Sequence, residues 1–202
     1  MLTVAVQAGG ESRRMGADKA RLPFLGRTLI ERVIERVRPL ADEIVVTTNH
    51  PEDYGYLGLP LFPDLEPGRG ALGGFYTALQ AASQPRVAMV ACDMPFTSAL
   101  LLAAECDLLT SLGVDVVIPS SGEGLEPLQA VYRRETCLPT VREAMRAGEW
   151  KLISWFDQVR VHTLTVEQVK QIDPDDRIFM NVNTREDLER AEKMATGEVD
   201  HR

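Results

Sequence analysis

After Met1 the chain opens with L-T-V-A-V-Q-A-G-G-E-S-R-R-M-G-A-D-K, residues 2–19. The apolar run Leu2–Val6 predicts a buried strand, and the glycines after it predict a loop. Glycine lets the backbone come close to a ligand, so that successive N–H groups can converge on phosphate oxygens. The opening of the chain therefore predicts a strand followed by a phosphate-binding loop.

Positive charge is in surplus in this loop. It contains Arg13, Arg14 and Lys19 against two acids, Glu11 and Asp18. An anionic ligand would neutralise the excess positive charge. The spacing matches neither the Rossmann pattern G-x-G-x-x-G nor the Walker pattern ending in G-K-[ST], which disfavours a P-loop NTPase.

Composition limits the class of protein. The 202 residues fit one domain, and the net charge of −8 disfavours a general nucleic-acid or anionic-membrane surface. Three cysteines, Cys92, Cys106 and Cys137, form no C-x-x-C pair, which favours a reducing compartment. Since no apolar run is as long as a membrane span, we expect a cytoplasmic protein with no nucleic-acid or membrane partner.

Strand-like and helix-like segments alternate along the chain. This rhythm predicts an α/β fold, a single-domain Rossmann-like three-layer arrangement with a mostly parallel sheet. We expect one domain over residues 1–195 and a disordered tail over 196–202. Predicted strands cover 2–6, 43–48, 59–64, 86–92, 114–119, 129–133 and 159–164, and predicted helices cover 29–37, 71–82, 98–109, 139–147 and 185–194, with a short helix opening at 165–168.

Three polar residues follow predicted strands. Ligands of parallel sheets bind beyond the carboxyl ends of the strands, so Asn49, Asp64 and Asp93 are expected to face one crevice with the basic loop. Asp93 follows directly after an apolar strand. It is not needed as the cap of the next helix, because Thr97 is the expected cap. Asp93 is therefore the candidate metal ligand, suited to a hard cation such as Mg²⁺.

Cationic side chains are the other catalytic candidates. Lys19 stands at the end of the glycine loop, where its ammonium group can follow charge as a phosphoanhydride breaks. Arg13 and Arg14 are adjacent and cannot be expected to face the ligand together, and we favour Arg14. No histidine or cysteine has a visible partner that would make it a nucleophile.

Several further motifs occur in order along the chain. The loop reads A-G-G-x-S-x-R-M-G-x-D-K, and it is followed by G-R-G-A-L-G-G, C-D-M-P-F, E-P-L-Q-A-V-Y and N-V-N-T. Together these motifs resemble the molybdenum cofactor guanylyltransferases over nearly the whole chain. Two positions differ from the family pattern: Gln7 replaces the usual apolar residue, and Thr47 stands where some members have an asparagine that touches the nucleotide, leaving Asn49 as the nearby amide.

The resemblance implies a fold of the nucleotide-diphospho-sugar transferase type and a function. Such an enzyme transfers GMP from GTP to the terminal phosphate of molybdopterin and releases pyrophosphate, with Mg²⁺ as cofactor. It implies a metal-binding role for Asp93 and a pterin-side role for Asn181 and Asn183, although an asparagine before a helix is also an ordinary cap. The implied nucleotide-binding residues are Gln7, Ala8, Gly9, Gly10, Lys19, Asn49, Asp64 and Asp93.

Other functions share the same motifs. A cytidylyltransferase acting on molybdopterin or a sugar-phosphate nucleotidyltransferase would use the same loop, lysine and acid. A nucleotide-binding regulator without catalysis is the alternative from another class, and the presence of Lys19 and Asp93 disfavours it. The implied partners are GTP and molybdopterin, together with molybdenum-insertion proteins and molybdoenzyme chaperones.

Overall fold

The computed structural model describes residues 1–8 and 18–197. Its centre is a seven-stranded sheet with the order β5-β4-β1-β6-β8-β7-β9, in which β8 runs antiparallel to both of its neighbours and the other pairs are parallel. The predicted mostly parallel α/β sheet is thus confirmed. The strands are β1 (Leu2–Gln7), β4 (Glu43–Thr47), β5 (Leu61–Phe62), β6 (Arg86–Ala91), β7 (Val116–Pro119), β8 (Gln129–Arg133) and β9 (Val161–Leu164).

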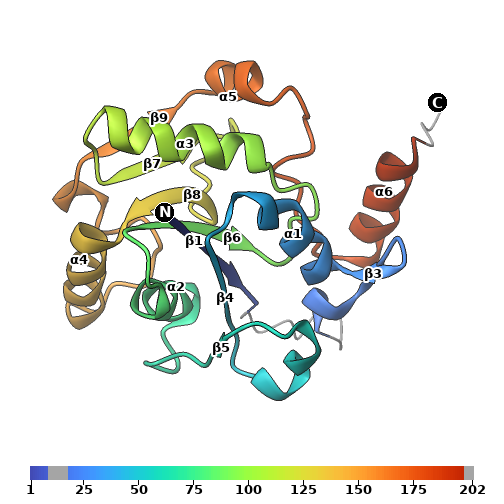
Figure 1. Cartoon of the computed structure of the whole chain (residues 1–202), viewed down its shortest axis with the longest axis horizontal. Coiled ribbons are helices and arrows are strands. Elements are labelled where there is room, and N and C mark those ends of the chain that lie inside the picture. The colour runs from blue at the N-terminus through green and yellow to red at the C-terminus, as the bar shows by residue number, and fades with distance from the viewer. Residues whose placement is uncertain (9–17, 198–202) are drawn as a thin grey trace.

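Helices cover both faces of the sheet (Figure 1). On one face α1 (Leu29–Val37), α3 (Ala99–Ser111) and α5 (Val166–Ile172) pack against one layer of strand side chains. On the other face α2 (Gly70–Ala81) and α4 (Arg134–Arg146) cover the opposite layer, which contains the buried Trp155. Alternate strand residues point to opposite faces, so strands with apolar residues at every position are buried on both sides.

A smaller apolar cluster holds the last helix, α6 (Arg185–Thr196). This helix stands at the side of the molecule, next to the hairpin of β2 (Pro23–Phe24) and β3 (Arg27–Thr28) (Figure 1). The cluster brings the segment before α6 to the end of β6, far from it in sequence. Its buried members are Phe24, Leu29, Phe96, Val182 and Ala191.

Two predicted helix starts were wrong in detail. The cap of α3 is Ser98, whose hydroxyl accepts a hydrogen bond from the backbone N–H of Leu101, whereas the Thr97 hydroxyl donates to the Met94 carbonyl at 2.8 Å. Helix α4 begins at Arg134, so that Pro139 lies inside it. The guanidinium of Arg134 donates to the Leu79 carbonyl of α2 at 2.9 Å, a tertiary contact that accompanies the earlier start.

The order of the strands creates a switch point beside β1. The chain moves from β1 outward to β4 and β5 and then returns to the other side of β1 as β6. Ligands of open α/β sheets bind where the strand order reverses in this way, outside the carboxyl ends. Among the residues that the structure describes, no helix combines the length and apolar composition that a membrane crossing requires.

Candidate functional site

The carboxyl ends of β4, β1 and β6 are level with one another. Gln7 of β1 is in register with Thr47 on one side and with Ala91 on the other. The backbone N–H of Ala8 donates to the Thr47 carbonyl at 2.8 Å, and that of Cys92 donates to the Gln7 carbonyl at 3.2 Å. The residues that follow these strands therefore lie along one edge of the sheet.

One part of this edge, which we call the α2 side, consists of Gln7, Thr47, Asn49, Asp64 and the first turn of α2. Two of its polar side chains, Asn49 and Asp64, are bonded to each other. The side-chain amide of Asn49 donates to the Asp64 carboxylate at 2.9 Å, and the Asn49 side-chain oxygen accepts from the Asp64 backbone N–H at 3.1 Å. Two segments 15 residues apart are thus held together at the end of β4 and β5.

The other part, which we call the α6 side, consists of Lys19, Asp93 and Asn183. Lys19 opens a short 3₁₀ helix, Lys19–Arg21, and its ammonium group donates to the side-chain oxygen of Asn183 at 2.8 Å. Asn181 takes no part in this contact, since its amide donates to the Phe179 carbonyl. Of the two predicted asparagines, the structure brings Asn183 to Lys19.

Asp93 follows β6 and is half-buried. Its backbone carbonyl accepts from the Val182 N–H at 2.8 Å, which fixes the segment before α6 beside it. Burial raises the pKa of the Asp93 carboxyl above its ordinary value, and the positive charge of Lys19 partly offsets that rise. Lys19 and Asp93 are therefore close enough to interact.

The Asp93 carboxylate fits a divalent cation. Within residues 1–8 and 18–197, no ion pair and no hydrogen bond from another residue engages it. It does not cap α3, because Ser98 has that role. An unpaired carboxylate that is partly removed from water is unfavourable without a counter-charge, and a hard cation that keeps several waters needs few protein ligands.

The end of the N-terminal loop is anchored by contacts that the sequence pattern did not predict. The hydroxyl of Tyr54 donates a hydrogen bond to the Asp18 carboxylate, and Arg21 forms an ion pair with Asp53 at 2.7 Å. Tyr54 is almost completely buried. No spacing or composition signal marks it, because it lies in a polar turn and becomes part of the core through tertiary packing.

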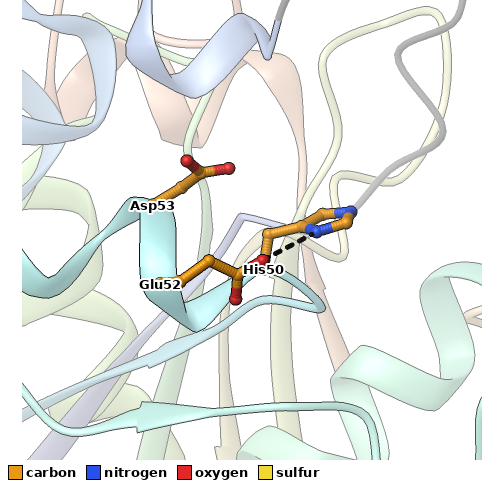
Figure 2. A group of neighbouring side chains, drawn as sticks. All are labelled: His50, Glu52 and Asp53. Atoms are coloured by element: carbon orange, nitrogen blue, oxygen red, sulfur yellow. Dashed lines mark hydrogen bonds and ion pairs between the residues drawn. The ribbon is translucent and has the colours of Figure 1, made fainter.

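A second group of possible metal ligands lies just after Asn49 in the chain. The ligand atoms of His50, Glu52 and Asp53 lie within 4.8 Å of one another, and Figure 2 shows Glu52 turned toward the His50 ring. The group is solvent-accessible, and the Asp53 carboxylate is already paired with Arg21. With one of its carboxylates engaged by an arginine and its other two side chains largely exposed to water, the group is not assigned as a metal site.

Thiol nucleophiles do not fit the described part of the chain. Burial raises the pKa of Cys106 to about 11 and that of Cys137 to about 12, and it also raises the pKa of Cys92. All three thiols therefore stay protonated near neutral pH. The predicted residues Gly9, Gly10 and Arg14 lie outside the described residues.

Known proteins match this chain over most of its length. A family model described as the MobA-like NTP transferase domain matches residues 4–166. The chain is 36% identical over 197 residues to the molybdenum cofactor guanylyltransferase of Desulfosudis oleivorans, and the match covers 95% of this chain and 94% of that protein.

Solved structures share the fold. The crystal structure of molybdopterin-guanine dinucleotide biosynthesis protein A from Archaeoglobus fulgidus superposes with a TM-score of 0.83 at 28% identity, covering 96% of this chain and 99% of that one. The 2-C-methyl-D-erythritol 4-phosphate cytidylyltransferase of Thermus thermophilus superposes with a TM-score of 0.70 at 22% identity, covering 96% and 98%. The latter similarity concerns the fold alone.

Proposed function

The chain belongs to the MobA-like NTP transferase family, and from this premise we propose that it transfers GMP from GTP to the terminal phosphate of molybdopterin. The product is the guanine dinucleotide form of the molybdenum cofactor, and pyrophosphate is released. One observation carries the proposal: the Asp93 carboxylate, which has no partner among the described residues, feels the positive charge of Lys19 at the carboxyl edge, in a chain similar to guanylyltransferases over nearly its full length.

The reaction is a displacement at phosphorus. An oxygen of the molybdopterin phosphate forms a bond to the α-phosphorus of GTP, and the bond from that phosphorus to the α–β bridging oxygen breaks. Pyrophosphate leaves with the electron pair. No covalent enzyme intermediate is needed, which agrees with the protonated thiols, so the protein contributes positioning and charge.

Lys19 is the proposed electrostatic catalyst. Its ammonium group donates a hydrogen bond to the Asn183 side-chain oxygen. Because the ammonium nitrogen carries three donors, it can also donate to a phosphate oxygen. A cation held in a fixed position stabilises the negative charge that grows on the leaving oxygens. Arg14 keeps its predicted role as a second cation.

Asp93 is the proposed ligand of a divalent cation, which we take to be Mg²⁺. When bound, the cation neutralises charge on the phosphate chain. The residue's own contribution is a carboxylate that has no partner among residues 1–8 and 18–197 and whose backbone is fixed by the bond to Val182. Asn183 and Asn181 are the proposed pterin-side residues.

The α2 side is the proposed nucleoside subsite, with Asn49, Asp64 and the backbone of Gln7 and Ala8. Guanine presents an acceptor at O6 and donors at N1 and N2, and adenine reverses this polarity. Each mismatch leaves a buried protein group unpaired, at about 1–3 kcal/mol. We expect GTP to bind at least about tenfold more tightly than ATP, since 1.4 kcal/mol corresponds to that ratio.

Incubation with molybdopterin, Mg²⁺ and each of the four NTPs tests the function. Pyrophosphate release and formation of the dinucleotide with GTP alone are the expected results. Preference for CTP would instead establish the cytidylyltransferase alternative, and nucleotide binding without pyrophosphate release would establish the regulator. The proposed setting is the cytoplasm, with molybdenum-insertion proteins and molybdoenzyme chaperones as protein partners.

A further inference from the structure

The side chain of Gln7 is buried at the carboxyl end of β1. Only 5% of the residue is exposed. Its amide nitrogen donates to the carbonyl of Ala71, in the first turn of α2, at 2.9 Å. Its amide oxygen is buried and has no hydrogen-bond partner in the described structure. Gln7 thus ties the central strand to the start of a helix 64 residues away.

The first turn of α2 depends on such ties. The residue at its N-cap, Arg69, makes no side-chain capping bond. Further along, the Thr77 hydroxyl donates to the Gly73 carbonyl at 2.9 Å and accepts from the Leu65 N–H at 3.0 Å. Thr77 therefore connects α2 to the segment that carries Asp64, and Gln7 connects it to β1.

Gly74 provides the space for the Gln7 amide. A Cβ atom at this position would lie 2.5 Å from the Gln7 amide nitrogen and 3.4 Å from a carboxylate oxygen of Asp64. No Cβ atom is tolerated at 2.5 Å, so a side chain here would displace the amide. The glycine, the Gln7 amide and the Asp64 carboxylate are accordingly packed as one unit.

Thr47 adds a second unsatisfied group. It is the register partner of Gln7, and its buried hydroxyl has no partner in the described structure. The residues two positions earlier on both strands, Ala5 and Val45, pack against the α2 layer, so Gln7 and Thr47 face α2 as well. Two buried polar groups without partners reduce folding stability.

We propose that Gln7 is a positioning residue of the nucleotide site, in that its side-chain amide fixes the glycine-rich first turn of α2 against β1 and so sets the affinity for the nucleoside triphosphate. This inference rests on the proposed function. Because the unpaired oxygen costs stability, the residue contributes to binding at the expense of the fold. A residue needed only for packing would stabilise the protein instead.

The variant Gln7→Leu separates these two roles. Leucine is of similar size, carries no donor, and leaves no unpaired oxygen. We expect the KM for GTP to rise about five- to tenfold, in the range of a single hydrogen bond, with kcat within about twofold and with Tm unchanged or higher. Gln80→Leu is the matched control, since Gln80 lies exposed near the other end of α2. An unchanged KM would overturn the proposal, whether or not Tm changes.

A second pair of variants distinguishes the hydrogen bond from packing. Gln7→Ala removes the amide and leaves a void, and the added Gly74→Ala places a methyl group into that space. We expect Tm to recover in the double variant while the KM stays as high as in Gln7→Ala. Recovery of both would show that only packing matters and would overturn the proposal.

Amide hydrogen exchange provides a measurement that does not depend on turnover. We expect the backbone amides of residues 72–75 to exchange faster in Gln7→Leu than in the unaltered protein. In Gln80→Leu they should exchange at the same rate as in the unaltered protein. Equal exchange rates in all three proteins would overturn the proposal. If the unaltered protein were inactive with every nucleotide, the proposed function would fail, and this exchange experiment would still decide whether Gln7 holds the first turn of α2.

Discussion

The α2 side and the α6 side of the carboxyl edge differ in how far their polar side chains are bonded to the rest of the protein. On the α2 side, Asn49 and Asp64 bond each other twice and Gln7 bonds the first turn of α2. On the α6 side, the Asp93 carboxylate has no partner of its own in the described structure, while Lys19 interacts with it only through charge. The α2 side is preorganised by internal hydrogen bonds, and the α6 side keeps charge available for a ligand.

This difference corresponds to two kinds of recognition. A nucleobase is neutral and must be recognised by groups held in fixed directions, so internal hydrogen bonds favour selectivity. A phosphate chain and its cation are charged, and a carboxylate already engaged by an arginine would bind a cation poorly. Substitutions on the α6 side should therefore affect turnover, and substitutions on the α2 side should affect affinity.

The largest effect is expected for Asp93→Asn. The amide keeps the size and removes the charge, so turnover should fall by about 10³-fold, equivalent to about 4 kcal/mol of barrier. Pyrophosphate release at saturating Mg²⁺ measures this effect. Since burial already disfavours the charged form of Asp93, Tm should not fall. Turnover near that of the unaltered enzyme would exclude Asp93 as the metal ligand.

The second-largest effect is expected for Lys19→Ala. The kcat should fall about 10²-fold, as is typical when an enzyme loses one group that stabilises charge in the transition state. The same assay applies, with the exposed Lys151→Ala as control. A decrease confined to KM would place Lys19 in ground-state binding and would weaken the contrast between the two sides of the edge.

The two asparagines before α6 provide a smaller and sharper test. Asn183 accepts a hydrogen bond from the Lys19 ammonium group and Asn181 does not. A bond to a charged group contributes about 1.5–3 kcal/mol, part of which the ligand replaces, so Asn183→Ala should reduce kcat about tenfold. Asn181→Ala should change kcat less than about twofold. Steady-state kinetics of the two variants, measured side by side, check this difference. A larger effect of Asn181→Ala would contradict the assignment of Asn183 as the partner of Lys19.

We expect Glu105→Gln to change neither turnover nor affinity for the nucleotide. The variant therefore tests folding stability alone. Glu105 is completely buried in α3, its carboxyl oxygens have no partner in the described structure, and burial raises its pKa well above the ordinary value. The folded protein therefore holds a proton that the unfolded chain releases above about pH 4.5.

The sign of the pH dependence follows from this difference. Protonated Glu105 contributes fully to the free energy of unfolding below about pH 4.5. As the pH rises from there toward the pKa of Glu105 in the folded state, the free energy of unfolding falls by up to about 1.4 kcal/mol per pH unit. The glutamine variant lacks this loss. Urea unfolding at pH 5 and pH 8 should show a steeper decline for the unaltered protein, and parallel declines would mean that Glu105 has a partner.

Much of the fold was predictable because its signals are local. Apolar runs marked the strands, the mostly parallel sheet followed from the alternation of elements, and the short helix predicted to open at 165–168 begins with a capping box of Thr165 and Gln168. The resemblance of the motifs to the guanylyltransferases was also a property of sequence, and the comparisons confirmed the family. These features depend on neighbours within a few residues along the chain.

The tertiary structure alone decided how the edge is assembled. Lys19 meets Asn183 across 164 residues, and Gln7 reaches Ala71 across 64. The choice of Ser98 over Thr97 as the cap of α3 also follows from packing, because the Ser98 hydroxyl donates a hydrogen bond to the carboxylate of Asp173 at the end of α5. A pattern of residues specifies what a segment can form by itself. Which polar group remains without a partner depends on every segment that packs around it, and this was known only once the chain had folded.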